Sequence, residues 1–133
     1  MLTARDIMTE NVVTVQPTCS VRSAIERLIS EQISGLPVVD ECGLLVGIVT
    51  EFALLATAYD DRVAGDSIAN HMTTDVLTVD VNDPVRKVAD LFIVHRVRRV
   101  PVMDKGRIAG LISRRDVLKV VFQNPAQYSP AAS

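Results

Sequence analysis

The side chains best suited to chemistry gather in two short segments of the C-terminal half. The segment Ser-Arg-Arg-Asp at 113–116 places the Ser113 hydroxyl and the Asp116 carboxylate three residues apart, at the start of an expected helix. A dense basic run, His-Arg-Val-Arg-Arg, lies just before it at 95–99. Arginine suits phosphate because its planar guanidinium donates to two oxygens at once. The two segments therefore predict an anion site with Arg98 and Arg99 as phosphate contacts.

Both segments also have a simpler structural interpretation. A serine followed three residues later by an acid is a common helix start, in which the hydroxyl caps and the carboxylate favours the positive helix end. Capping and ligand binding can coexist at Ser113 and Asp116, and the arginines could form an ordinary solvated surface. Nucleic acid is not an expected partner, because the net charge is −2, aromatic residues are 4% and tryptophan is absent.

Histidine and cysteine do not indicate a second reactive site. His71 and His95 lie far apart in sequence, and neither has another metal ligand at suitable spacing, so no metal is expected. Cys19 and Cys42 are too few for a disulfide framework, and neither has a neighbouring base. No pattern of a catalytic triad or a glycine-rich phosphate loop is visible, so the chain is not expected to be an enzyme.

The ends and the hydrophobic runs predict a location. The N-terminal residues lack the basic start and apolar run of a signal peptide. No uncharged apolar run approaches the roughly 18 residues of a membrane helix. A cytoplasmic protein with no membrane contact is therefore expected.

The elements that must position these residues occur twice. Shifting the sequence by about 64 residues superposes one half on the other, and the matches include Met-Thr at 8–9 and 72–73, Pro-Val at 37–38 and 101–102, and the glycines at 47 and 110. So many matches in one register indicate a tandem duplication. We expect repeat one at 1–59, a linker at 60–66, repeat two at 67–122 and a flexible tail at 123–133.

Each repeat predicts the order strand, helix, strand, strand, helix, which is an α/β fold. Apolar residues at helical spacing begin at Val21 and Val85, and Pro84 suits a first helical position with Asp83 as its cap. Thr50 is expected to cap the last helix of repeat one, as Ser113 does in repeat two. The expected strands are 12–15, 36–39, 45–49, 76–79, 100–103 and 107–112, and the expected last helices are 51–59 and 114–122.

A repeat of about 60 residues buries too little apolar surface to be stable alone. The two repeats are therefore expected to pack sheet against sheet as one pseudo-twofold unit, with two related clefts between them. Apolar stripes left over on the helices predict a homodimer interface. These stripes comprise Leu28, Ile29, Leu54, Leu55, Phe92, Ile93, Leu118 and Val121.

The ordered motifs resemble the cystathionine β-synthase (CBS) domain pair. They are Met-Thr-x-x-Val-x-Thr-Val, then a helix, then Gly-Leu-Pro-Val-Val-Asp or Arg-Val-Pro-Val-Met-Asp, a glycine turn, and Gly-apolar-apolar-Thr/Ser. The likeness covers residues 1 to about 122. It implies tandem CBS repeats packed as one pair that binds adenosine-containing ligands, such as AMP, ADP, ATP or S-adenosylmethionine, in the clefts between repeats. These are regulatory ligands rather than cofactors, and such pairs commonly dimerise.

The resemblance assigns roles to particular residues. The ribose-binding element Thr/Ser-x-x-Asp is complete at 113–116, whereas Ala53 occupies the carboxylate position of repeat one, and a methyl group accepts no hydrogen bond from ribose. The complete cleft would take adenine contacts from Val12, Val13, Ile33 and Ser34, phosphate contacts from Arg98, Arg99 and Ser113, and its ribose acceptor from Asp116. The second, weaker cleft would use Val76, Leu77, Val97 and Thr50.

Three functions follow from these patterns. The first is a ligand-sensing regulatory module that binds an adenosine-containing nucleotide. The alternative is a scaffold or dimerisation module with vestigial clefts, which the Ala53 departure favours. An enzyme with an unrecognised site is the third. The sequence names neither the physiological ligand nor the regulated protein target, and it leaves the direction of the dimer open.

Overall fold

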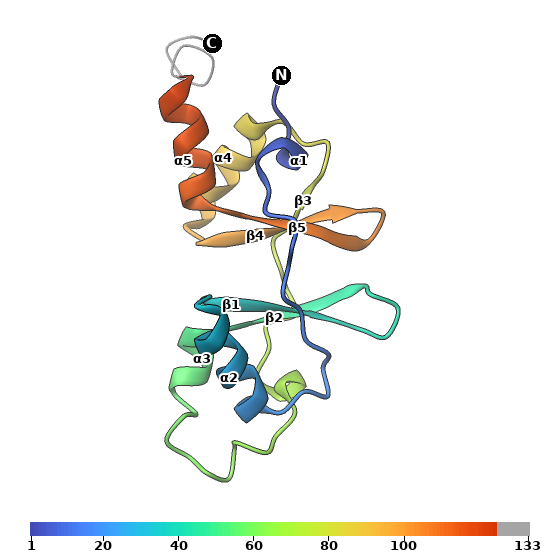
Figure 1. The fold of residues 1–133 in the computed structure, drawn as a ribbon, viewed down its shortest axis with the longest axis vertical. Helices are drawn as coiled ribbons and strands as arrows, with labels where there is room; N and C mark the ends of the chain where they lie inside the picture. The colour runs from blue at the N-terminus through green and yellow to red at the C-terminus, as the bar shows by residue number, and fades with distance from the viewer. Residues whose placement is uncertain (125–133) are drawn as a thin grey trace. The chain divides into compact units, whose positions relative to one another are not determined.

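The chain folds into two compact units of short sheets and helices (Figure 1). A computed structural model describes residues 1–124, so the predicted tail lies outside the described residues from 125 onward. The unit Val13–Val76 contains helix α2 (Val21–Glu31), and we call it the α2 unit. The other unit, Met1–Val12 together with the chain from Leu77 onward, contains helix α5 (Arg114–Gln123), and we call it the α5 unit. Within the described part of the chain, no helix has the length and apolar character needed to cross a bilayer.

The α2 unit is built on an antiparallel hairpin of β1 (Gly35–Val39) and β2 (Leu45–Thr50). Helices α2 (Val21–Glu31) and α3 (Glu51–Leu55), with the 3₁₀ turn η1 (Ile68–Asn70), contribute apolar side chains to the core of this unit. This core is aliphatic, as the low aromatic content requires. It contains Val21, Ala24, Leu28, Leu36, Val38, Val49, Leu54 and Ile68.

The α5 unit also contains an antiparallel hairpin packed with helices, and its sheet has one additional strand. Its strand β4 (Arg99–Asp104) runs parallel to β3 (Val79–Asp80) and antiparallel to β5 (Arg107–Ser113), giving a three-stranded sheet. Buried residues of the sheet and helices form its core, among them Val88, Phe92, Val100, Val102, Ile112 and Val117. Its elements are α1 (Ala4–Ile7), β3 (Val79–Asp80), α4 (Val85–His95), β4 (Arg99–Asp104), β5 (Arg107–Ser113) and α5 (Arg114–Gln123).

The first leading arm, residues 1–12, opens repeat one in sequence but completes the α5 unit in space. The Ala4 N–H donates to the Asp83 carbonyl at 2.8 Å. Further along the arm, the Thr9 N–H donates to the Leu111 carbonyl at 2.8 Å, and the Leu111 N–H returns a bond to the Thr9 carbonyl at 3.0 Å. The arm is therefore held by the backbone of repeat two.

The second leading arm, residues 65–76, makes the same bonds in the α2 unit. The Ile68 N–H donates to the Cys19 carbonyl at 2.8 Å, and Thr73 exchanges two bonds of 2.9 Å with Ile48. Ile68 and Thr73 match Ala4 and Thr9 of the first arm, and their partners Cys19 and Ile48 match Asp83 and Leu111. The duplication therefore extends to single hydrogen bonds. The compact units therefore have different boundaries from the sequence repeats.

Two of the predicted strands are almost absent. In the segment 12–15, only Val15 forms a bridge, to Val38, and the Val12 N–H turns back to the Glu10 carbonyl at 2.8 Å. In the segment 76–79, only Val79 joins a strand. The β-branched residues there give strand propensity, but too few backbone partners lie alongside to extend a ladder.

The last helix of repeat one is shorter than predicted, since α3 ends at Leu55 rather than near Tyr59. The Thr57 hydroxyl donates to the Leu54 carbonyl at 2.8 Å, and the following backbone bonds span three residues rather than four. These bonds replace the α-helical pattern with a run of turns.

The cap predicted at Asp83 is also wrong. Pro84 is the N-cap of α4, and its side chain makes no capping bond. The Asp83 carboxylate instead accepts the Asp80 N–H at 2.9 Å and pairs with Lys87 at 3.2 Å. Its oxygens therefore bind the preceding turn and the helix surface.

Three of the residues predicted for an exposed stripe are in the core. Leu28, Leu54 and Phe92 are at most 7% exposed, whereas their neighbours Ile29, Leu55 and Ile93 are 62–74% exposed. Successive helical residues point about 100° apart, so only one of each adjacent pair can face the core. Leu118 is exposed as predicted, at 67%, and Val121 is partly buried against the core.

Candidate functional site

Ser113 and Asp116 form a reciprocal capping box at the start of α5. The Asp116 N–H donates to the Ser113 hydroxyl at 3.2 Å, and the Ser113 N–H donates to the Asp116 Oδ2 at 2.9 Å. Both residues are partly buried. A carboxylate has acceptor positions for about four bonds, and among residues 1–124 it accepts this one. The cap therefore leaves capacity for a ligand hydroxyl.

The matching position in the α2 unit keeps only half of this arrangement. Thr50 is the N-cap of α3, and its hydroxyl accepts the Ala53 N–H at 3.1 Å. Ala53 provides no carboxylate to return the bond. The two units therefore differ at the atom that would receive a ribose.

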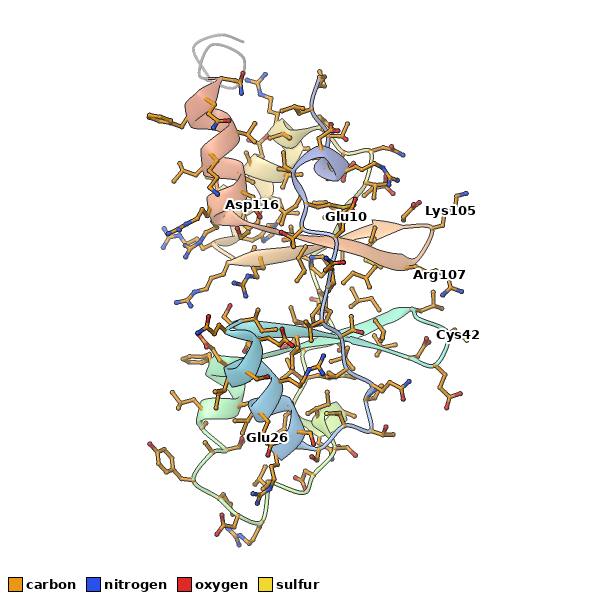
Figure 2. The ribbon with its side chains drawn as sticks, in the orientation of Figure 1. Glu10, Glu26, Cys42, Lys105, Arg107 and Asp116 are labelled. Carbon is orange, nitrogen blue, oxygen red and sulfur yellow. The ribbon has the colours of Figure 1, made fainter. Side chains whose placement is uncertain are left out.

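The predicted phosphate contacts lie next to this cap within the α5 unit. Arg99 opens β4 and stands opposite Ser113 in the antiparallel register. Arg98 comes just before it, and its carbonyl accepts the Arg114 N–H at 3.1 Å. The hairpin thus brings Arg98, Arg99, Ser113 and Asp116 to one end of the unit. Figure 2 shows nitrogen-tipped side chains gathered beside Asp116 at this end.

The predicted adenine contacts divide between the two units. Val13, Ile33 and Ser34 belong to the α2 unit, and Val12 closes the first leading arm of the α5 unit. Within the α2 unit, the Ser34 carbonyl accepts the Glu51 N–H at 2.9 Å, which ties Ser34 to the start of α3.

The weaker predicted site divides in the same way. Its residues Thr50 and Val76 lie in the α2 unit, and Leu77 and Val97 lie in the α5 unit. Gly35 stands opposite Thr50 in the hairpin, as Arg99 stands opposite Ser113. The two predicted sites therefore have the same strand register, but glycine replaces arginine opposite the helix cap in the α2 unit.

The remaining reactive groups form no second centre. Burial raises the pKa of the Cys19 thiol, and neither Cys19 nor the exposed Cys42 forms a disulfide. His71 lies 3.4 Å from the Asp66 carboxylate. In the part of the chain that the structure describes, no three His, Cys, Asp or Glu side chains gather as metal ligands.

The two repeats agree with a known family. The model of the CBS domain family matches residues 4–59 and again residues 65–123. This chain belongs to the CBS domain family. The paired match covers nearly the whole sequence, so the chain is a tandem CBS pair with an α/β fold.

Solved CBS pairs are similar to this chain over most of its length. CBSX2 from Arabidopsis thaliana, solved in complex with AMP, is 31% identical with a TM-score of 0.84, covering 92% of this chain and 98% of that chain. The CBS pair of MJ0100 is 30% identical with a TM-score of 0.79, covering 92% and 98%. That structure contains 5′-methylthioadenosine and S-adenosylmethionine.

Curated relatives include longer proteins. MJ1225 of Methanocaldococcus jannaschii is 28% identical over 117 residues, which cover 88% of this chain and 42% of that protein. A homoserine O-acetyltransferase from Methanocorpusculum labreanum is 36% identical over 115 residues, which cover 84% of this chain and 23% of that enzyme. The chain thus spans less than half the length of these relatives.

Proposed function

We propose that this CBS pair is a regulatory module that binds one adenosine-containing ligand per chain, with Asp116 as the ribose acceptor. The observation that carries the proposal is the asymmetry between the repeats: a carboxylate stands at Asp116 and a methyl group at Ala53. The likeness to CBSX2 with AMP, and to MJ0100 with 5′-methylthioadenosine and S-adenosylmethionine, supports the ligand class.

The proposed site combines apolar, acidic and basic contacts. The adenine ring would lie against Val12, Val13, Ile33 and Ser34. The ribose hydroxyls would donate to Asp116, using acceptor positions that the capping bond leaves open. A phosphate would receive bonds from Arg98, Arg99 and Ser113. The second site, at Val76, Leu77, Val97 and Thr50, would bind weakly because it lacks the carboxylate.

Regulation requires that the ligand bind one arrangement of the protein more tightly than another. In this proposal the ligand makes contacts in both units, so its binding favours one arrangement of them. A regulated protein target would read that arrangement. The proposal includes no catalytic step, no cofactor and no metal, and the cytoplasmic location stays a prediction.

The capping box supports a second candidate, a scaffold with vestigial sites. The bonds between Ser113 and Asp116 account for both side chains without a ligand. A scaffold would melt at the same temperature with and without nucleotide. The regulatory module would be stabilised by RT ln(1 + [L]/Kd), so its melting temperature would rise with the logarithm of ligand concentration above Kd.

Asp116→Asn separates the two candidates in a thermal-shift assay with AMP, ADP, ATP and S-adenosylmethionine. Asparagine keeps an oxygen that can accept the Ser113 N–H, so the loss of apo stability should be small, on the order of 0.5 kcal/mol. Binding should weaken by about 1.5–3 kcal/mol, because bonds to a charged acceptor are stronger. The ligand-induced shift should therefore nearly vanish. A variant that loses apo stability and keeps its ligand response would support the scaffold.

Ala53→Asp is the reciprocal variant. The Ala53 N–H already bonds the Thr50 hydroxyl, so an acid here takes the place that Asp116 holds in α5. The proposal predicts that this change adds a second binding event per chain. An unchanged stoichiometry would show that the carboxylate is not what separates the two sites.

We also propose that the protein is a homodimer. Exposed apolar residues remain on the helices of both units, including Ile29, Leu55, Ile93 and Leu118. Patches of this kind commonly mark symmetric interfaces. Light scattering at tens of micromolar should give the mass of two chains, and the mass of one chain would contradict the proposal.

A further inference from the structure

Two of the four methionines recur at matching positions in the repeats, and each rests on a matching glycine. In the α5 unit, a Cβ at Gly110 would lie 2.6 Å from the Met8 Sδ, so this sulfur sits against bare backbone. In the α2 unit, a Cβ at Gly47 would lie 2.7 Å from the Met72 Sδ. Each sulfur therefore occupies space that any side chain at the glycine would need.

The arm segments that begin with these methionines have few other attachments. We call 8–12 and 72–76 the arm ends. Among the described residues of the α5 unit, the first arm end makes two backbone hydrogen bonds to repeat two, both between Thr9 and Leu111. The second arm end makes two such bonds to repeat one in the α2 unit, both through Thr73. The methionine contact is therefore a large part of what holds each arm end.

The two methionines are apolar anchors that still lie near solvent. Met8 packs against the core of the α5 unit and Met72 against the core of the α2 unit, yet both are partly exposed. A small oxidant such as hydrogen peroxide therefore has a route to them in the folded protein. The other two methionines lie outside the arm ends, since Met1 is 93% exposed and Met103 is a partly exposed residue of β4.

Oxidation of a methionine thioether is a transfer of one oxygen atom. The sulfur attacks a hydroperoxide, an S–O bond forms and the O–O bond breaks. With hydrogen peroxide the second oxygen leaves as water. The sulfur loses two electrons and the peroxide gains them, so the step is balanced. The product is a sulfoxide, which is polar and chiral where the thioether was apolar.

A sulfoxide does not suit the contact with the glycine backbone. Its oxygen is an acceptor that needs a donor or water, and an unpaired buried polar atom is costly. The Thr9 carbonyl oxygen lies 2.8 Å from the Cβ position at Gly110, and the Thr73 carbonyl oxygen lies 2.9 Å from that at Gly47. Both carbonyls are acceptors and cannot donate to the sulfoxide. Movement toward water satisfies the sulfoxide, and this movement detaches the arm end.

We propose that Met8 and Met72 are paired oxidation sites, at which hydroperoxides form sulfoxides that release the arm ends from the hairpins. Reduction of the sulfoxides restores the docked arms. Val12 closes the first arm end and is also an adenine contact in the proposed function. Weaker ligand binding after oxidation is therefore an added consequence that rests on the proposed function, whereas the release of the arm ends does not rest on it.

The test is stepwise oxidation with hydrogen peroxide. Mass spectrometry measures the sulfoxide at each methionine, and amide hydrogen exchange is measured on the same samples. Dithiothreitol is added first, because it reverses cysteine oxidation to disulfides and sulfenic acids. Exchange at the Thr9 and Thr73 amides should accelerate by at least about tenfold as Met8 and Met72 become oxidised. The Ala4 amide, which makes a 2.8 Å bond at the start of the first arm, should keep its protection.

The double variant Met8→Leu, Met72→Leu resists this oxidation, because leucine keeps the apolar volume and has no sulfur. Peroxide should leave its exchange at Thr9 and Thr73 unchanged. Met103→Leu is the matched control, and it should respond to peroxide as the parent does. Treatment of the oxidised parent with methionine sulfoxide reductases for both epimers should restore slow exchange.

Three results would overturn the inference. The first is full oxidation of Met8 and Met72 with no change of exchange at Thr9 and Thr73. The second is sulfoxide that forms at these two methionines only when the whole protein unfolds. The third is equal acceleration by peroxide in the double leucine variant. Released arm ends with unchanged nucleotide affinity would support the oxidation sites and contradict Val12 as a ligand contact in the proposed function.

Discussion

Replacing Gly110 by alanine should release the first leading arm from the α5 unit. A Cβ at Gly110 would lie 2.6 Å from the Met8 Sδ, 2.8 Å from the Met8 Cγ and 2.8 Å from the Thr9 carbonyl oxygen. Carbon contacts are favourable near 3.5–4.0 Å. The flexible Met8 side chain can move aside, but the Thr9 carbonyl is backbone and accepts the Leu111 N–H.

The loss of stability in Gly110→Ala can be estimated from the displacement of Met8 and Thr9 that the added methyl group requires. Overpacking of a well-packed site costs about 1–3 kcal/mol. This cost includes the backbone shift at Thr9, which strains its two backbone bonds with Leu111. Gly110→Ala should therefore destabilise the protein by about 1–3 kcal/mol.

Urea unfolding followed by circular dichroism measures this loss, and amide hydrogen exchange at Thr9 and Leu111 locates it. Gly47→Ala should behave alike, because its Cβ would lie 2.7 Å from the Met72 Sδ and 2.9 Å from the Thr73 carbonyl oxygen. Gly65→Ala is the control, since its Cβ would meet nothing within 4 Å. A loss below about 0.5 kcal/mol at Gly110, or an equal loss at Gly65, would refute the reasoning.

Three further predictions concern pH, thiols and a turn. The pKa of Asp6 is lowered chiefly by the hydrogen bond from the Thr3 N–H, so the Asp6 carboxylate stabilises the fold at neutral pH and loses this effect as it protonates. The difference in melting temperature between the parent and Asp6→Asn should therefore narrow below about pH 4. A difference that stays constant with pH would contradict this. Burial raises the pKa of Cys19 and so lowers the fraction of reactive thiolate. A thiol reagent should therefore modify the exposed Cys42 first, and mass spectrometry measures the order. Faster modification of Cys19 would be evidence against this. Lys105 has φ 54° in the β4–β5 turn, so Lys105→Asn should raise stability by about 0.5–1 kcal/mol in urea unfolding; a lower midpoint would oppose this.

The hairpins could be predicted closely from the sequence because their signals are local. An apolar run, a turn with glycine and a second apolar run gave strands within a few residues of β4 and β5. The caps at Thr50 and Ser113 were also predictable, since a helix start depends on adjacent residues. Helix faces were harder, because periodicity did not decide which of Leu28 and Ile29 would be buried.

The leading arms could not be predicted, because their docking depends on backbone bonds between distant segments. Thr9 and Leu111 carry no side-chain feature that pairs them. A signal was nevertheless present: a methionine and a glycine recur in register in both repeats, and each methionine packs on the other repeat's glycine. Contacts between distant segments also limit what the sequence predicts about the proposed ligand site. The hairpin predicts that Arg98 lies near Ser113, whereas the adenine contacts come from distant segments and stay a prediction.

The measurement that tests the central claim most directly is a calorimetric titration of the purified protein with the adenine nucleotide that stabilises it most. The account predicts saturable binding with a stoichiometry near one per chain, and loss of most of that affinity in Asp116→Asn. A stoichiometry of two would show that Ala53 does not disable the second site. No heat with any adenosine ligand, or full affinity in Asp116→Asn, would contradict the regulatory function and leave Asp116 as a helix cap.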